Sequence, residues 1–391
     1  MQNNYNKMVT TITIIFGSIL LVLTITGILM NPFFRVPVGK KEDKDTADAE
    51  AGKGGVPVSV IMMANGDTAA LERSLPLFLN QEYEPGFQVI VVTEKGNSQD
   101  NDAIKRFVGD PHIVTTFIPD TSRYISREKL GITLGVKAAA NDWCILVDCH
   151  SYPASNHWLR EISSRCTDGN NLVIGYSNYD KDSKSYMRFL RLKHFAYLWR
   201  ECRKGTAYSA NGANLAFRKA DFIGNDGFRG NLDIIRGEYD FIVNKLAQKG
   251  RTAVVTSLEG SLIENKPADK QWHKQRIFYI HSCKHMQRSR RHKMWSFWDT
   301  LFLHLAWIAT VCAIAFAAIT SDYILLGIAI ACILMLACGR IVLSKRAIKA
   351  FDADISAWRI IPLELSSVWH SVADRLRHFT TDSYDFTCHK I

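Results

Sequence analysis

Asp148 and His150 stand two residues apart at the end of an apolar run, "CILVD" followed by Cys149 and His150. Three consecutive apolar residues at 145–147 are typical of a strand that is covered on both faces. Residues two apart on an extended chain point to the same side, so Asp148 and His150 could bind one cation together. The alternative is that Asp148 caps a turn and His150 is a solvated loop residue.

Alternating strands and helices must position this pair between residues 56 and 168. Strands separated by helices of this length form right-handed parallel units, which predicts an α/β fold with one mostly parallel central sheet. The carboxyl ends of the strands carry Asn65, Glu94 and Asp148, which we expect to gather on one rim. The predicted strands are 58–63, 87–92, 112–118 and 143–148, and the predicted helices are 67–80, 97–108 and 126–140.

The net charge of +10 over 391 residues raises the question of nucleic acid, but the position of the basic residues answers it differently. Two basic clusters lie beside long apolar segments, as expected for cytoplasmic flanks that contact anionic membrane lipids. We therefore predict membrane lipids and no nucleic acid as partners. The clusters are Lys284, Arg288, Arg290, Arg291, Lys293 and Arg340, Lys345, Arg346, Lys349.

Three uncharged segments are long enough to be candidate membrane spans: 9–30, 300–321 and 323–338. The first is too long for a signal-peptide core and no cleavage site follows it, which indicates an uncleaved anchor. The other two, separated by Asp322, form a predicted hairpin, although a buried hairpin of a soluble protein is the alternative. The basic flanks place residues 35–299 in the cytosol, so we expect a multi-pass protein of the inner (cytoplasmic) membrane.

The sequence divides into an N-terminal transmembrane anchor (1–34), a charged flexible tether (35–55), an α/β domain (56–299), a transmembrane hairpin (300–339) and a cytosolic tail (340–391). The tail is expected to form an interfacial amphipathic helix or, equally, a helix that packs on the α/β domain. Nine cysteines show no metal or disulfide spacing and are expected to be reduced thiols. No pattern specifies an oligomeric state.

The order of motifs from about Val56 to Tyr279 resembles family-2 glycosyltransferases, which have a nucleotide-sugar-binding α/β fold of the GT-A type. The resemblance covers more than two hundred residues, and the flanking apolar segments fit membrane-anchored bacterial members. The motifs are "VSVIMMAN", "LFLNQEY", "VIVVTE", "KLGITLGVKAAANDWCILVDCHSYP", "NGANLAFRK", "GEYDFIVNKLAQKG" and "WHKQRIFY".

The resemblance implies an inverting hexosyltransferase that moves one sugar from a nucleotide-sugar donor to a lipid-linked or membrane-proximal glycan acceptor, in the assembly of a cell-envelope polysaccharide. It implies that a divalent cation, Mn²⁺ or Mg²⁺, stabilises the departing diphosphate. Asp148 and His150 would hold that cation, with His150 in place of the usual second Asp. The donor-binding residues it implies are Asn65, Glu94, Lys129 and Asp148.

The transfer also needs a base for the acceptor hydroxyl. Glu238 and Asp240 in "GEYD" are the candidates, and Asp240 is slightly favoured. An ungapped alignment places Tyr239 at the usual base position, and acids at a helix start are also favoured electrostatically.

The motif before the second apolar segment supplies the acceptor or diphosphate residues that the resemblance implies: Trp272, Gln275 and Arg276. Phe278 and Tyr279 replace its usual Arg-Trp end, which with only three spans favours transfer of a single sugar. The substitutions at Gly66, His150, Tyr239 and Phe278 support a second hypothesis. In it, the chain is a catalytically inactive family member that acts as a scaffold in a membrane glycan-assembly complex.

Overall fold

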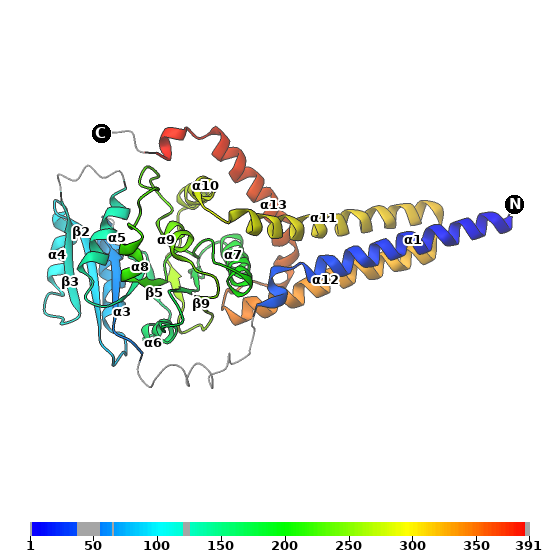
Figure 1. The fold of residues 1–391 in the computed structure, drawn as a ribbon. Helices are drawn as coiled ribbons and strands as arrows, with labels where there is room; N and C mark the ends of the chain where they lie inside the picture. The colour runs from blue at the N-terminus through cyan, green and yellow to red at the C-terminus, as the bar shows by residue number, and fades with distance from the viewer. Residues whose placement is uncertain (1, 37–54, 65, 120–125, 388–391) are drawn as a thin grey trace.

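An α/β domain and a bundle of three long helices make up the computed structural model, which describes residues 2–36, 55–64, 66–119 and 126–387 (Figure 1). The bundle projects from one end of the α/β domain.

Among the described residues, seven strands form the central sheet in the order β3-β2-β1-β4-β8-β6-β9. The first four are parallel, which confirms the predicted strand–helix units, with strand boundaries within two residues of those expected. The sequence did not predict β8, which runs antiparallel to both of its neighbours, or the parallel pair of β6 and β9. The strands are β1 Val58–Met63, β2 Phe87–Glu94, β3 Ile113–Ile118, β4 Trp143–Asp148, β6 Leu172–Gly175, β8 Leu215–Arg218 and β9 Thr252–Val255.

A second, three-stranded sheet lies next to the end of β4 and has the order β5-β10-β7. Its strands are β5 Ser151–Pro153, β7 Ser177–Tyr179 and β10 Leu262–Glu264. Strand β10 is antiparallel to β5, so that Glu264 lies opposite Ser151, and Asn265 donates its N–H to the carbonyl of His150 at 2.8 Å. This small sheet therefore brings a distant acid beside the Asp148–His150 segment.

Helices cover both faces of the central sheet, as the apolar strands predict. Along β1, Val60 and Met62 pack in one hydrophobic core with α3, while Ile61 and Met63 pack in the other with α5. The helices of this domain are α3 Thr68–Leu79, α4 Ser98–Lys105, α5 Arg127–Ala138, α6 Trp158–Ser163, α7 Ser185–Lys204, α8 Lys219–Gly224, α9 Glu238–Leu246 and α10 Asp269–His285.

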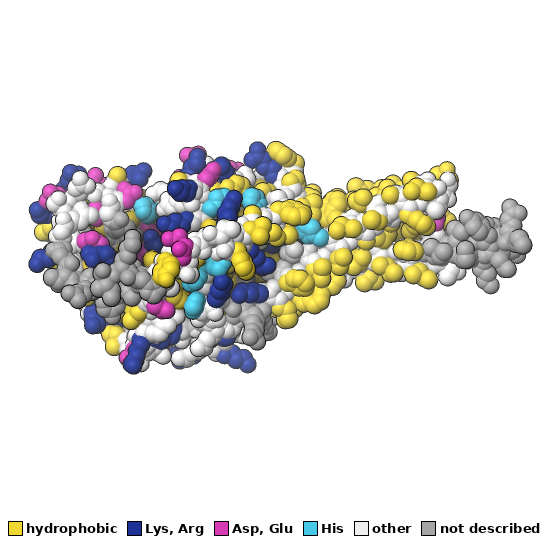
Figure 2. Space-filling model, turned by 90° about the horizontal axis from the view of Figure 1, so that it is seen from above, with side chains coloured by type: hydrophobic (Ala, Val, Ile, Leu, Met, Phe, Trp, Pro, Cys, Tyr) yellow, Lys and Arg dark blue, Asp and Glu magenta, His cyan; other side chains and the backbone are white. Residues whose placement is uncertain are grey.

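The bundle consists of α1 Gln2–Leu29, which is followed by the 3-10 turn η1 Pro32–Arg35, and of α11 Ser289–Thr320 and α12 Tyr323–Ala350. Hydrophobic side chains cover its surface, whereas charged side chains gather on the α/β domain (Figure 2). Within the described residues, Lys293–Thr320 and Tyr323–Ala350 are long and apolar enough to cross a membrane, and α1 contains a shorter apolar stretch, Thr13–Leu29. The predicted hairpin is thus present as α11 and α12, with α12 continuing beyond the expected boundary at residue 339.

Arg340 is a correction to the predicted basic flank. Its side chain is buried between the helices, where it pairs with Asp299 at 3.1 Å and with Glu364 and donates to the carbonyl of Gly27 at 2.6 Å. Two buried carboxylates require a cationic partner, because an unpaired buried charge is strongly destabilising. Arg340 therefore holds the base of the bundle together and does not face lipid.

The C-terminal helix α13, Ala357–Thr380, runs crosswise to the bundle where the bundle meets the α/β domain (Figure 1). One face packs on α10, α12 and α7, with Glu364 and Asp374 buried. The opposite face exposes apolar side chains, with Trp369 71% and Phe379 88% accessible. The helix thus packs on the domain, as one of the two sequence-based alternatives predicts, and an interfacial position for its exposed apolar face stays a prediction. A short 3-10 turn, η2 Ser383–Asp385, follows.

Candidate active site

Asp148 and His150 lie together at the carboxyl end of β4. Oδ1 of Asp148 accepts a hydrogen bond from the backbone N–H of His150 at 2.9 Å, so Asp148 also caps this turn. The ligand atoms of Asp148, Cys149 and His150 all lie within 4.8 Å of one another. The structure therefore brings the two predicted metal ligands together.

The donor set at this turn fits a divalent cation. Cys149 is fully buried, and burial raises the pKa of its thiol, which keeps it protonated and unsuited to binding a hard cation. A carboxylate and an imidazole remain, which together suit Mn²⁺ and similar ions. Asp67, the cap of α3, lies 3.6 Å from Nδ1 of His150 and adds a second carboxylate to the surroundings of the ring.

Sequence reasoning missed a partly buried ion pair between Arg191 of α7 and Glu264 of β10. Arg191 also donates to Oγ of Ser177 at 3.2 Å. Burial raises the pKa of Glu264, Arg191 lowers it, and the Asp148 carboxylate raises it, which places the pair next to Asp148. No short-range spacing links residues 191 and 264, so only the three-dimensional fold reveals the pair.

Gly212 explains how the "NGAN" loop passes this ion pair. Its φ is +87°, and a Cβ at this position would lie 2.2 Å from Nη2 of Arg191 and 2.8 Å from Oε1 of Glu264. Only glycine allows the backbone to approach so closely. The loop that the resemblance assigned to the acceptor side therefore contacts the pair beside Asp148.

Glu238 opens α9 and is 6% exposed. Burial raises the pKa of this carboxyl, Arg236 and Lys129 lower it, and Asp148 raises it, so Glu238 lies close to the Asp148 turn. Within the described residues, Oε2 of Glu238 has no hydrogen-bond partner. Gly237 before it has a φ of +96°, and a Cβ there would lie 2.5 Å from Oγ of Ser282.

Tyr239 and Asp240, the next two residues of α9, have different surroundings. Burial and the Asp148 carboxylate raise the pKa of Tyr239, which keeps its hydroxyl protonated. Oδ1 of Asp240 accepts the backbone N–H of Ala210 at 3.0 Å. Burial raises the pKa of Asp240 to about 7, with Glu238 raising it further and Arg191 lowering it.

Arg236 is a second residue that the sequence did not single out. Its side chain is half exposed and forms an ion pair with Glu128 of α5. The carboxylates of Glu128, Glu238 and Asp148 raise the pKa of Arg236. A partly accessible guanidinium therefore lies near the candidate metal turn.

The predicted donor-binding residues have different surroundings. Lys129 is 0% exposed and donates to the carbonyls of Asn231, at 2.6 Å, and Ile234; burial lowers its pKa to about 8. These contacts fix the segment that leads into α9 and leave no exposed ammonium for a ligand. Glu94 ends β2 on the expected rim but forms an ion pair with Arg127, and Asn65 lies outside the described residues.

The residues predicted for the acceptor or diphosphate lie on α10 and are used largely in packing. Trp272 is 2% exposed and meets Tyr186 edge-to-face with ring centroids 5.3 Å apart. Nε of Arg276 donates to Asp374 of α13 at 2.5 Å. Gln275 is exposed. The structure thus joins Asp148 with His150 and places Glu238 where the charge of Asp148 acts on it, but it directs Trp272 and Arg276 into the contacts of α10 with α7 and α13.

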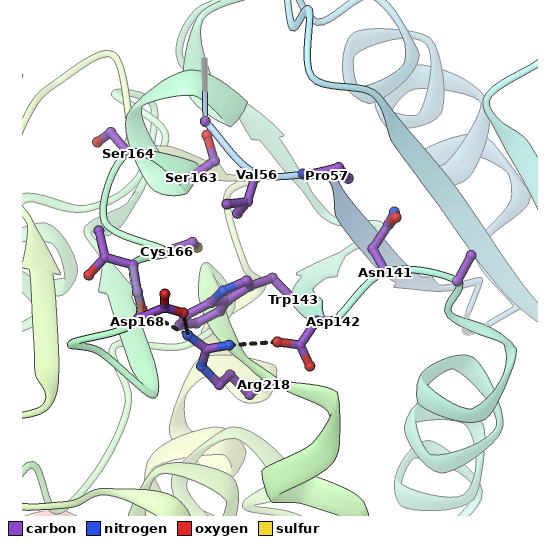
Figure 3. Close-up of a pocket in the computed structure, with 13 residues that line it drawn as sticks. Val56, Pro57, Asn141, Asp142, Trp143, Ser163, Ser164, Cys166, Asp168 and Arg218 are labelled. Carbon is purple, nitrogen blue, oxygen red and sulfur yellow. Dashed lines mark hydrogen bonds and ion pairs between the residues drawn. The ribbon is translucent and has the colours of Figure 1, made fainter. Parts of the chain in front are cut away.

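A cavity of about 550 Å³ opens at the amino ends of β1 and β4, away from the Asp148 rim (Figure 3). Arg218 lies at its edge and is neutralised by Asp142 at 2.6 Å and Asp168 at 2.9 Å. Because its cation already has two carboxylate partners, we do not assign this cavity to a phosphate-containing donor.

No protein-family model and no curated protein matches the sequence. The fold is similar to the solved structure of the mannosyltransferase PcManGT from Pyrobaculum calidifontis in complex with GDP-Man and Mn²⁺. The TM-score is 0.52 at 13% identity, over 88% of this chain and 99% of that chain. S. aureus TarS (residues 1–349), in complex with UDP-GlcNAc, matches with a TM-score of only 0.40 at 10% identity, over 83% of this chain and 92% of that chain. The first similarity shows that this chain has a glycosyltransferase fold.

Proposed function

We propose that this chain is a membrane-anchored, inverting glycosyltransferase that moves a single sugar from a nucleotide-sugar donor to a lipid-linked or membrane-proximal glycan acceptor. The observation that carries the proposal is the placement of Asp148 and His150 at the carboxyl end of β4, beside the buried acid Glu238 at the start of α9. The mannosyltransferase that shares the fold was solved with a nucleotide sugar and Mn²⁺, which supports a nucleotide sugar as the donor here.

Asp148 and His150 would hold a divalent cation, which supplies positive charge against the departing diphosphate. Arg236 adds a guanidinium on the same side, and Glu128 orients it. Arg191 and Glu264 hold the Gly212 loop beside this turn, so that the backbone around the donor is fixed before the reaction begins.

Glu238 is the base that we propose, in preference to Asp240. Its Oε2 has no partner among the described residues, and its raised pKa brings it toward the range in which a carboxylate accepts a proton efficiently. Oδ1 of Asp240 already accepts the N–H of Ala210. We therefore assign Asp240 the role of positioning the loop before Gly212.

The bundle and α13 support the membrane part of the proposal. The outward apolar faces of α11 and α12 suit a bilayer core, and the crosswise α13 suits its interface, where tryptophan is favoured. The basic residues that flank the apolar segments favour a cytosolic α/β domain at the inner membrane.

Tryptophan quenching in nanodiscs with brominated acyl chains tests this arrangement. We expect Trp369→Phe to remove quenchable fluorescence, because Trp369 is exposed on α13. The control Trp158→Phe, at the fully buried first residue of α6, should remove only unquenched fluorescence. Equal effects of the two variants would contradict an interfacial α13.

Sugar transfer itself is tested with the full chain in nanodiscs, a panel of nucleotide sugars and Mn²⁺ or Mg²⁺, with donor hydrolysis and transfer to a membrane extract as readouts. We expect turnover with at least one donor and its loss in Asp148→Asn. No donor binding and no hydrolysis with either metal would contradict the enzymatic proposal.

The scaffold hypothesis remains the second candidate, because Arg276 and Trp272 are used in packing and not left open to an acceptor. It predicts that cells with Asp148→Ala make the same glycan as the wild type. Loss of the glycan while the variant protein is still present at the membrane would favour the enzyme.

A further inference from the structure

Charged residues line the seam between α7 and α11 at the base of the bundle. Those around Asp299 neutralise one another. Lys193 of α7 pairs with Asp299 of α11 at 3.1 Å, and the hydroxyl of Tyr197 donates to the same carboxylate at 2.7 Å. Arg340 completes this group with Asp299 and Glu364. The two cations and two carboxylates balance each other.

Arg200 continues this seam without an acidic ion-pair partner among the described residues. It lies two helical turns beyond Lys193 on α7, and across from it Trp295 occupies the position one turn before Asp299 on α11. The guanidinium carbon of Arg200 lies 3.7 Å from the centroid of the Trp295 ring. Arg200 is 8% exposed, its Nε has no hydrogen-bond partner, and no carboxylate of the described residues forms an ion pair with it.

Two further arginines surround Arg200. The indole N–H of Trp199 donates to the carbonyl of Arg35 at 3.3 Å, which brings the end of η1 beside α7, and Arg203 lies 5.9 Å from the ring of Trp199. Burial and Arg35 lower the pKa of Arg200, while Glu201 and Asp299 offset this only in part. Arg200 therefore carries a positive charge that no carboxylate of the described residues pairs with.

These arginines lie at the level where a bilayer that surrounds the bundle would present its headgroups. Arg35 ends η1, the turn that follows α1, and Trp295 lies at the start of the apolar span Lys293–Thr320 of α11. Arginine forms paired hydrogen bonds with phosphate, and tryptophan is enriched at this depth. Anionic lipids supply phosphate groups at the cytoplasmic surface.

We propose that Arg200, together with Arg35 and Arg203, binds the phosphate group of an anionic membrane lipid at the base of the bundle. The inference rests on the membrane part of the proposed function and not on sugar transfer. Lipid binding there neutralises Arg200, which has no carboxylate partner among the described residues, and so joins η1, α7 and α11 at the membrane surface.

The test titrates the full chain, in an uncharged detergent, with short-chain phosphatidylglycerol, with phosphatidylcholine of the same chain length, and with inorganic phosphate, and counts bound ligand by native mass spectrometry. We expect saturable binding of phosphatidylglycerol, at least tenfold tighter than that of either other ligand. Arg200→Gln should weaken it at least tenfold, and Lys105→Gln, an exposed cation on α4, should leave it unchanged.

Arg35→Gln keeps the test decisive if Arg200→Gln fails to fold, because Arg35 is exposed and its carbonyl still accepts from Trp199. Equal binding by phosphatidylcholine, or by both arginine variants and the wild type, would overturn the proposal. Inorganic phosphate that binds as tightly as the lipid would assign the site to a soluble anion instead. No sugar donor is present, so the result is independent of the transferase assay.

Discussion

The carboxylate of Asp148 accepts the backbone N–H of His150 at 2.9 Å, which fixes both residues in one turn at the end of β4. The side chain of His150 is thereby held beside the carboxylate, with Asp67 3.6 Å from its Nδ1. This turn therefore holds one oxygen ligand and one nitrogen ligand side by side, and the metal preference of this pair is testable.

His150→Asp should shift this preference from Mn²⁺ toward Mg²⁺, because a set of oxygen ligands alone suits the harder cation. We expect the ratio of donor hydrolysis rates in Mg²⁺ and Mn²⁺ to rise roughly tenfold. Parallel rate measurements in the two metals check this. An unchanged ratio would show that His150 does not contact the ion.

Glu238→Gln should lower kcat by about 10²–10⁴ while leaving donor affinity within a few-fold of the wild type, since it removes a base and leaves the metal turn intact. Asp240→Asn is the matched control, because an amide oxygen can still accept the N–H of Ala210. Steady-state kinetics and donor titration separate the two effects. If Asp240→Asn abolishes turnover and Glu238→Gln does not, Asp240 is the base.

Asp240 also predicts a pH dependence of stability. Burial raises the pKa of Asp240 in the folded protein to about 7, whereas an unfolded aspartate titrates near 3.8. Protonated Asp240 is thus favoured in the folded protein, so this stabilisation is complete below about pH 4 and is lost as the pH rises through 7. The titratable groups that interact electrostatically with Asp240 are Glu238, Arg191, Tyr208, Tyr279 and Cys283.

Asp240→Asn should therefore raise the thermal unfolding midpoint relative to the wild type at pH 8, and should raise it by less than half as much at pH 5. The gain in the free energy of unfolding is up to about 4 kcal/mol, at roughly 1.4 kcal/mol per pKa unit. Thermal unfolding in the same detergent at both pH values measures it. A variant that is less stable at pH 8 than at pH 5, relative to the wild type, would contradict the buried protonated state.

Arg276 supports a different prediction from the one that its motif suggested. Its partner Asp374 is fully buried and also lies 3.2 Å from Arg377 and 3.3 Å from Nδ1 of His273. Asp374→Asn should lower the free energy of unfolding by about 1–3 kcal/mol, because it removes a buried counter-charge from two partly exposed arginines. Donor affinity should stay unchanged.

The control for this prediction is Asp102→Asn, which removes an exposed partner of Lys105 on α4 and should cost less than about 1 kcal/mol. If Arg276→Ala weakens donor binding without lowering stability, Arg276 binds the diphosphate after all, as the motif implies.

Local patterns were sufficient to predict the strands and helices up to β4 and the pairing of Asp148 with His150. Apolar runs and two-residue spacing act over short distances and are visible in one stretch of sequence. The partnership of Arg191 with Glu264, and of Arg340 with Asp299 and Glu364, depends on helices and strands that meet only after folding. Lys129 shows the same limit, because its motif does not reveal that two backbone carbonyls occupy its ammonium.

The binding of Mn²⁺ in the presence of a nucleoside diphosphate, followed by electron paramagnetic resonance for the full chain and for Asp148→Asn, tests the metal-assisted site most directly. The proposed site predicts one bound Mn²⁺ whose affinity increases when the diphosphate is present and falls at least tenfold in Asp148→Asn. Equal binding by the two proteins, or no binding under either condition, would contradict it.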